Sequence, residues 1–88
     1  MARVALVTGG SQGIGRAIAR ELAGRGYGIF LAALDNSFLD KTAAELIATF
    51  KVPVIKFPVD LTNETAALTI KEYIESEGIS LKILVNNA

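Results

Sequence analysis

A glycine-rich segment near the amino terminus is the part of this chain best suited to chemistry. It reads Thr8-Gly9-Gly10-Ser11-Gln12-Gly13-Ile14-Gly15, with four glycines in seven residues. The apolar residues 4–7 before it are typical of a buried strand, and apolar residues after it recur at helical spacing. At such a strand-to-helix turn, free backbone amides and the helix dipole both favour an anion. The segment therefore predicts a phosphate-binding turn.

The spacing of the glycines distinguishes between known phosphate loops. A P-loop needs Lys followed by Ser or Thr after its last glycine, whereas this chain has Arg16-Ala17. The G-x-G-x-x-G dinucleotide pattern, counted from Gly13, would need a glycine where Ile18 stands. The pattern Thr-Gly-x-x-x-Gly-x-Gly remains, with a longer turn before the helix. A purely structural turn normally needs one glycine, so four of them disfavour that alternative.

Each residue of this pattern has a predicted role. Gly9 can take a backbone conformation that is forbidden to other residues, and Gly13 allows the close approach of a diphosphate. Gly15 lets the helix pack tightly on the strand. Ser11 and Gln12 can add side-chain or amide donors.

Strands and helices alternate along the whole chain. A first helix over about 14–25 is ended by Gly26-Tyr27-Gly28, and further strands are predicted over 29–34, 54–59 and 81–85. Pro58 removes a ladder donor, so it should lie at a strand end or a sheet edge. The order β-α-β-α-β-α-β predicts one α/β domain, a doubly wound parallel sheet with helices on both faces.

The helices are predicted from caps and apolar spacing. Ser37 and Asp40 stand at capping-box spacing, Thr62 is predicted to cap a third helix, and Gly78 to close it. The apolar faces predicted for the three helices are Ile14, Ala17, Ile18 and Leu22; Leu39, Ala43, Leu46, Ile47 and Phe50; and Ala67, Ile70 and Ile74.

Composition excludes several classes of function. The chain has 88 residues, 51% of them apolar and 20% charged, with net charge zero and neither Cys nor His. A nucleic-acid partner is not expected without a basic patch, and thiolate or histidine chemistry is absent. No apolar run approaches the ~20 residues of a membrane helix, and no signal peptide is evident, so we expect a cytoplasmic protein without a membrane partner.

Three motifs carry a resemblance to a known family. The glycine loop, Asp60-Leu61 after the third strand, and Asn86-Asn87-Ala88 at the end of the fourth resemble the short-chain dehydrogenase/reductase family. The amino-acid sequence of residues 4–19 is most similar to that of the family's 3-oxoacyl-[acyl-carrier-protein] reductase branch. The resemblance spans the chain and implies a Rossmann-type sheet with strand order 3-2-1-4. It also implies NAD(H) or NADP(H) as cofactor and hydride transfer with a carbonyl or alcohol substrate.

Cofactor contacts follow from the resemblance position by position. Residues 9–14 would cradle the pyrophosphate and the adenosine ribose, and Asp60 with the Leu61 amide would bind the adenine edge. Asn86 would line the cofactor near a ribose. Asp60 can also be read as a carboxylate leading a helix beside Thr62, and Asn87 as a purely structural hydrogen-bonding residue.

The choice between NAD and NADP stays open on this sequence. An acidic residue at the end of the second strand binds the ribose 2′-hydroxyl, and a basic one accommodates a 2′-phosphate. The corresponding positions hold Ala33 and Leu34, so neither signal is present. Asp35 could reach the ribose or be a solvated loop carboxylate. Gln12 stands where many NADP-dependent relatives have a basic residue, and Arg16 is the nearest cation.

The family's catalytic Tyr-x-x-x-Lys pair is missing from this chain. Tyr27 is followed four residues later by Leu31, and Tyr73 by Glu77. We therefore expect residues 1–88 to be the cofactor-binding, amino-terminal part of a longer enzyme, inactive alone, with the substrate pocket and tetramer interfaces elsewhere. The alternatives are a short nucleotide-binding module whose partner covers the strand 81–85, or a decayed gene product without function.

Overall fold

The computed structural model describes residues 3–9, 13–34 and 37–87. Strands and helices alternate in it as predicted. They are β1 (Val4–Thr8), α1 (Gly13–Gly24), β2 (Gly28–Ala33), α2 (Ser37–Phe50), β3 (Val54–Pro58), α3 (Ala66–Ser76) and β4 (Leu81–Asn86).

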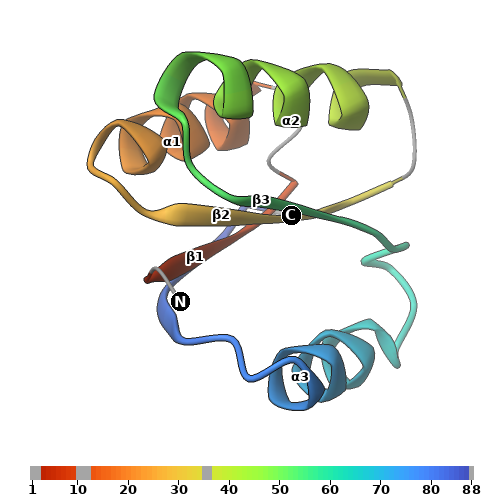
Figure 1. Cartoon of the computed structure of the whole chain (residues 1–88). Helices are drawn as coiled ribbons and strands as arrows, with labels where there is room; N and C mark the ends of the chain where they lie inside the picture. The colour runs from red at the N-terminus through yellow and green to blue at the C-terminus, as the bar shows by residue number, and fades with distance from the viewer. Residues whose placement is uncertain (1–2, 10–12, 35–36, 88) are drawn as a thin grey trace.

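The four strands form one parallel sheet in the order β3-β2-β1-β4. Helices α1 and α2 cover one face of this sheet and α3 covers the other (Figure 1). The predicted doubly wound α/β fold and its strand order are therefore confirmed. Pro58 is the last residue of the edge strand β3, where its missing amide donor breaks no ladder bond.

Small residues let α1 lie close to the sheet. Gly15, Ala19 and Ala23 are its buried residues, and they lie over a core that includes Ile29 and Leu31 of β2. Ile14 and Ala17, predicted on the apolar face, are exposed instead. Close packing on a sheet favours the side with small side chains, so the buried stripe is turned toward the glycine and alanines.

Helix α2 packs on the same face through Leu39, Ala43 and Leu46, as predicted. Ile47 is 49% exposed, contrary to prediction. The helix begins at Ser37 itself, and the capping-box interaction predicted for this residue lies outside the described side chains. The Asp40 carboxylate accepts a hydrogen bond from Lys56 Nζ of β3 at 2.8 Å.

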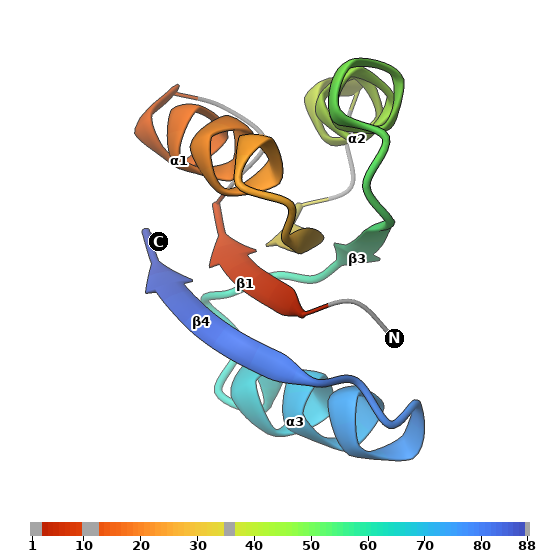
Figure 2. The ribbon, with the colours of Figure 1, turned by 60° about the vertical axis from the view of Figure 1, so that its left-hand side comes forward.

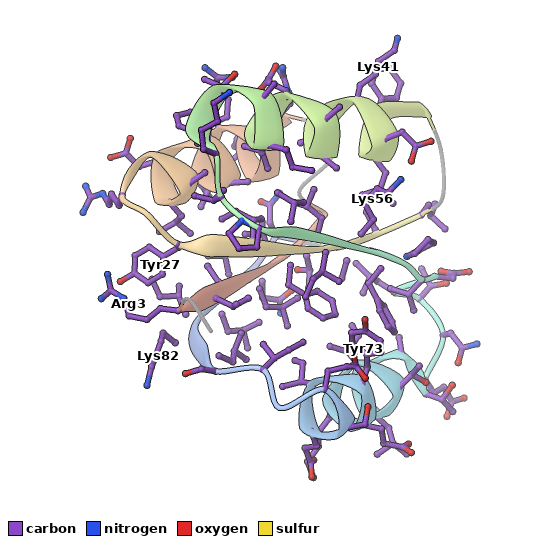
Figure 3. All side chains as sticks on the ribbon, in the orientation of Figure 1. Arg3, Tyr27, Lys41, Lys56, Tyr73 and Lys82 are labelled. Atoms are coloured by element: carbon purple, nitrogen blue, oxygen red, sulfur yellow. The ribbon has the colours of Figure 1, made fainter. Side chains whose placement is uncertain are left out.

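An aromatic cluster fills the opposite face. Phe30 of β2 is fully buried between Phe57 of β3 and Tyr73 of α3, with ring centroids 5.3 and 5.9 Å away. Figure 3 shows the Tyr73 side chain rising from α3 toward the sheet. From α3, the buried residues are Ala66 and Ile70. Ala67, predicted to face inward, is exposed, and the neighbouring Ala66 is buried in its place.

The segment before α3 corrects the prediction that Thr62 caps this helix. Helix α3 begins at Ala66 with Thr65 at the N-cap, and no side chain caps it. Asp60 Oδ1 accepts bonds from the Thr62 amide and hydroxyl, and Asn63 Oδ1 accepts the equivalent pair from Thr65. Such local bonds compete with helix formation and delay its start. Gly78, with φ +62°, follows the helix end as predicted.

Candidate functional site

All four strands are parallel, so their carboxyl ends meet at one edge of the sheet. Figure 2 shows β1 and β4 running side by side toward this edge. Thr8 at the end of β1 is in register with Ala32 of β2 on one side and with Asn86 of β4 on the other. The helix after β1 and the helix before β4 cover opposite faces. The boundary between β1 and β4 is therefore the topological switch point, where doubly wound sheets bind their ligands.

The Thr8 hydroxyl joins β1 to β4 at this point. Its Oγ1 accepts a hydrogen bond from the Asn87 amide at 2.9 Å. The same oxygen lies 3.2 Å from Asn86 Oδ1 and 3.3 Å from the Val85 carbonyl, and its one proton can be donated to either. The Asn87 main chain thus has a structural hydrogen bond at this point, and Asn86 lies at the end of β4 beside Thr8.

Gly9 continues β1 in a conformation that requires glycine. Its φ is +65°, and its amide donates to the Ala32 carbonyl of β2 at 2.9 Å. A Cβ at this position would lie 3.0 Å from the Asn87 carbonyl oxygen. The predicted special backbone of Gly9 is confirmed, and the close approach of Asn87 gives a second reason for glycine.

Helix α1 begins at Gly13. Gly13 has φ +57°, and no described atom would come within 4 Å of a Cβ placed there. This helix has no acidic residue in its first turn, so its dipole is not neutralised locally. Ile14 is 72% exposed and Gly15 is buried. Among the described residues, none fills the space beside Gly13, while Gly15 allows close packing on the sheet.

Three predicted site residues, Ser11, Gln12 and Asp35, lie outside the described residues. Asp60 follows β3 at the same edge of the sheet and is exposed. The Thr62 hydroxyl, followed by the Thr62 amide, lowers the pKa of the Asp60 carboxyl by hydrogen bonding to its ionised form. Leu61 beside it is half-buried. The ionised form of Asp60 is therefore favoured in the turn after β3. Asp60 is not at the start of α3, which begins at Ala66.

A groove of about 720 Å³ begins at Thr8 and Asn86 and extends between α3 and β4. Leu6 and Leu84 line it from the sheet, and Ala67 and Ile70 from α3. Leu84 is 62% exposed. Sequence reasoning missed this groove, although one of its alternatives placed a partner over the strand 81–85.

An ion-pair cluster connects the two helices above the sheet. Glu45 of α2 pairs with Arg16 and with Arg20 of α1. Its pKa is lowered, mainly by the hydrogen bond from Arg20 and then by the charge of Arg16, although partial burial acts in the opposite direction. The i,i+4 spacing of the two arginines was a signal in the sequence, but their partner could not be read from it.

Metal-binding clusters and membrane-spanning helices are both lacking in the described part of the chain. Residues 3–9, 13–34 and 37–87 contain no cluster of acidic side chains that could hold a metal ion. The same ranges contain no helix that is long and apolar enough to cross a membrane.

Comparison with known proteins agrees with this geometry. The family profile described as short chain dehydrogenase matches residues 3–88. The chain belongs to the short-chain dehydrogenase family. The recognition made from the glycine loop, Asp60-Leu61 and Asn86-Asn87 is thereby confirmed.

Relatives in this short-chain dehydrogenase family include two reductases. A rhamnolipids biosynthesis 3-oxoacyl-[acyl-carrier-protein] reductase of Pseudomonas aeruginosa is 41% identical over 86 residues, which cover 98% of this chain and 33% of the relative. A very-long-chain 3-oxoacyl-CoA reductase of Bos taurus is 40% identical over 83 residues, which cover 94% of this chain and 26% of the relative. The chain thus spans about a quarter to a third of the curated relatives it matches.

Solved structures of short-chain dehydrogenases share the fold. L-sorbose reductase of Gluconobacter frateurii, complexed with NADPH and L-sorbose, superposes with a TM-score of 0.90 at 37% identity, over 99% of this chain and 33% of that one. The Pseudomonas aeruginosa RhlG/NADP complex superposes with a TM-score of 0.84 at 40% identity, over 98% of this chain and 34% of that one.

Proposed function

We propose that residues 1–88 form the dinucleotide-binding part of an NAD(P)-dependent oxidoreductase. The observation that carries this proposal is the geometry at the switch point. Left-handed Gly9 is held against Asn87 there, and left-handed Gly13 opens α1 with no described atom over it. An oxidised or reduced nicotinamide dinucleotide fits because its diphosphate can occupy that space and accept bonds from the helix amides.

Different residues of the chain would bind different parts of the cofactor. Gly9, Gly13, Ile14 and Gly15, with Ser11 and Gln12, would form the diphosphate cradle. Asp60 and the Leu61 amide would hold the adenine, and Asp35 would reach the adenosine ribose if NAD(H) is bound. Asn86, beside the Thr8 hydroxyl, would line the cofactor near a ribose. When bound, the nicotinamide would supply or accept the hydride exchanged with a carbonyl or alcohol.

The activity of the whole protein is part of the same proposal. The names of the two relatives describe reductases of 3-oxoacyl thioesters, which supports a 3-oxoacyl substrate. Residues 1–88 contain no Tyr-x-x-x-Lys pair, so the proposed hydride transfer requires residues outside this segment. We further propose a cytoplasmic, homo-oligomeric enzyme, with a tetramer as the expected assembly.

Calorimetric titration of NAD⁺ and NADP⁺ into the natural polypeptide tests this function. Gly13→Ala should weaken binding of the preferred nucleotide by roughly tenfold, because the Cβ occupies the diphosphate space and the left-handed backbone is strained. Gly78→Ala is a matched control, since Gly78 has a φ of +62° and equally open surroundings at the end of α3. Equal losses in both variants, or no saturable binding by the unmodified protein, would refute the proposal.

A second function is favoured by the open groove between α3 and β4. A non-catalytic nucleotide-binding module would need a partner over Leu84 and its neighbours, because 62% exposure of a leucine in a strand is unfavourable. Such a module would bind the nucleotide but reduce no 3-oxoacyl thioester when assayed as the natural polypeptide. Measurable hydride transfer from NADPH or NADH would exclude it.

A further inference from the structure

The Arg16–Glu45–Arg20 cluster has an uneven charge. One carboxylate is shared by two guanidinium groups, so the cluster carries one positive charge in excess. The side chains of Arg16 and Arg20 are each 43% exposed and that of Glu45 is 27% exposed. Hydrogen bonding from Arg20 is the largest cause that lowers the pKa of Glu45, which keeps this carboxylate ionised near neutral pH. If one arginine leaves, Glu45 still has a partner.

The two arginines are not held equally. The Arg20 guanidinium also lies over the Phe50 ring, 5.6 Å from its centroid, and therefore has a second favourable contact. Arg16 is held by its ion pair with Glu45 and lies over no aromatic ring among the described residues. Arg16 is thus the more easily released member of the cluster, with Arg20 able to retain Glu45.

Arg16 also lies closer than Arg20 to the amino end of α1, where the diphosphate is expected. It is in the first turn of α1, three residues after Gly13, whereas Arg20 is a turn further on. The ribose 2′ group in a Rossmann site lies near the end of the second strand, and Ala33 and Leu34 supply no charge there. Of the neighbouring lysines, Lys56 is bonded to Asp40, and Figure 3 shows Lys41 pointing outward from α2.

We propose that Arg16 is the specificity-determining residue for a 2′-phosphate, and that Glu45 regulates it by competing for its guanidinium. This inference rests on the proposed dinucleotide function. Binding of a 2′-phosphorylated nucleotide draws Arg16 from Glu45 toward the phosphate, and Arg20 keeps the Glu45 carboxylate paired. A nucleotide with a free 2′-hydroxyl leaves the cluster as it stands. Glu45 thereby sets how strongly the protein distinguishes NADP from NAD.

Paired titrations of NADP⁺ and NAD⁺ into the natural polypeptide test this role. Arg16→Gln should weaken NADP⁺ binding by roughly tenfold, the loss of one charge-assisted contact, and change NAD⁺ binding by less than about twofold. Glu45→Gln should strengthen NADP⁺ binding several-fold, because Arg16 is no longer held, and the gain should vanish in the double variant. Arg20→Gln should weaken NADP⁺ binding, since Glu45 then holds Arg16 alone.

Arg25→Gln is the matched control. Arg25 is an exposed arginine just after α1 that pairs with Glu21 at 3.0 Å, so it should leave both affinities unchanged. Equal effects of Arg16→Gln on NADP⁺ and NAD⁺, or a gain from Glu45→Gln that persists without Arg16, would overturn the inference. Thermal unfolding identifies any variant that fails to fold, and Arg20→Gln then supplies the decisive comparison. If the unmodified protein binds neither nucleotide, the proposed function fails instead.

Discussion

Replacing Gly9 with alanine should destabilise the protein at the junction of β1 and β4. Two costs arise from the structure. The left-handed backbone, with φ +65°, costs a residue with a Cβ about 1–2 kcal/mol. The new Cβ would lie 3.0 Å from the Asn87 carbonyl oxygen, and relieving such overpacking costs roughly 1–3 kcal/mol. The expected loss of unfolding free energy is therefore about 2–5 kcal/mol.

Urea unfolding of the natural polypeptide, followed by circular dichroism, measures this loss. Gly78→Ala again serves as a control, because its φ is +62° and no described atom is within 4 Å of its Cβ position. Both variants gain the same reduction in unfolded-state entropy, so the difference between them isolates the contact with Asn87. We expect Gly9→Ala to be less stable than Gly78→Ala by roughly 1–3 kcal/mol.

The same variant should change the local dynamics of Asn87. Displacing its carbonyl also displaces its amide, which donates to Thr8 Oγ1 at 2.9 Å. Amide hydrogen exchange at Asn87 should therefore accelerate in Gly9→Ala and stay unchanged in Gly78→Ala. Equal destabilisation of the two variants, together with unchanged exchange at Asn87, would refute the view that close approach requires glycine at position 9.

Three further predictions concern other contacts. Thr8→Val should lower the unfolding free energy by about 1–3 kcal/mol, because the half-buried Asn87 amide loses its acceptor, and Thr8→Ser should restore most of it in the same urea assay. The folded-state pKa of Glu45 is lowered, so its ion pairs stabilise the protein above the unfolded pKa of glutamate and lose that effect as pH falls through the folded pKa. Stability should fall more steeply between about pH 5 and pH 3 in the unmodified protein than in Glu45→Gln, by no more than about 1 kcal/mol for such exposed pairs. Lys51 has φ +58°, so Lys51→Gly should raise the thermal midpoint, with a gain near 0.5–1 kcal/mol, and an unchanged or lower midpoint would contradict this reading.

The alternation of strands and helices was predictable because buried strands and glycine breaks are local signals. The special backbone conformation predicted for Gly9 is confirmed by its positive φ, and Gly78 follows the end of α3 as predicted. Strand order required the family resemblance, since right-handed crossovers alone leave the placement of the last strand open.

The errors arise where local patterns compete with tertiary packing. Apolar spacing favoured Ile14 in the buried face of α1, but Ala19 and Ala23 bring the helix closer to the sheet. Thr62 fits the sequence pattern of a helix cap. Its amide and hydroxyl instead donate hydrogen bonds to the Asp60 carboxylate, and the helix begins later. A single sequence does not reveal which of two valid local arrangements the fold selects.

The candidate site was predictable to the extent that it depends on backbone. The glycine loop was found from spacing and Asp60 from the family resemblance, and the nucleotide roles of the predicted residues stay predictions. The pairing of Arg16 with Glu45 was not predictable, because the residues are 29 positions apart and come together only when α1 and α2 pack. The bond between Thr8 and Asn87 was hidden for the same reason.

That bond has a consequence for the order in which the protein acquires function during synthesis. Thr8 and Asn87 are 79 residues apart in the chain. At about 5–20 residues per second, Asn87 is made roughly 4–16 s after Thr8. The nascent chain can pair β1 with β2, and β2 with β3, in that interval, but the contact that Asn87 makes beside Gly9 cannot yet exist. The first-made segment of the site is thus completed by the last of the four described strands, and nucleotide affinity should appear only after β4 has docked.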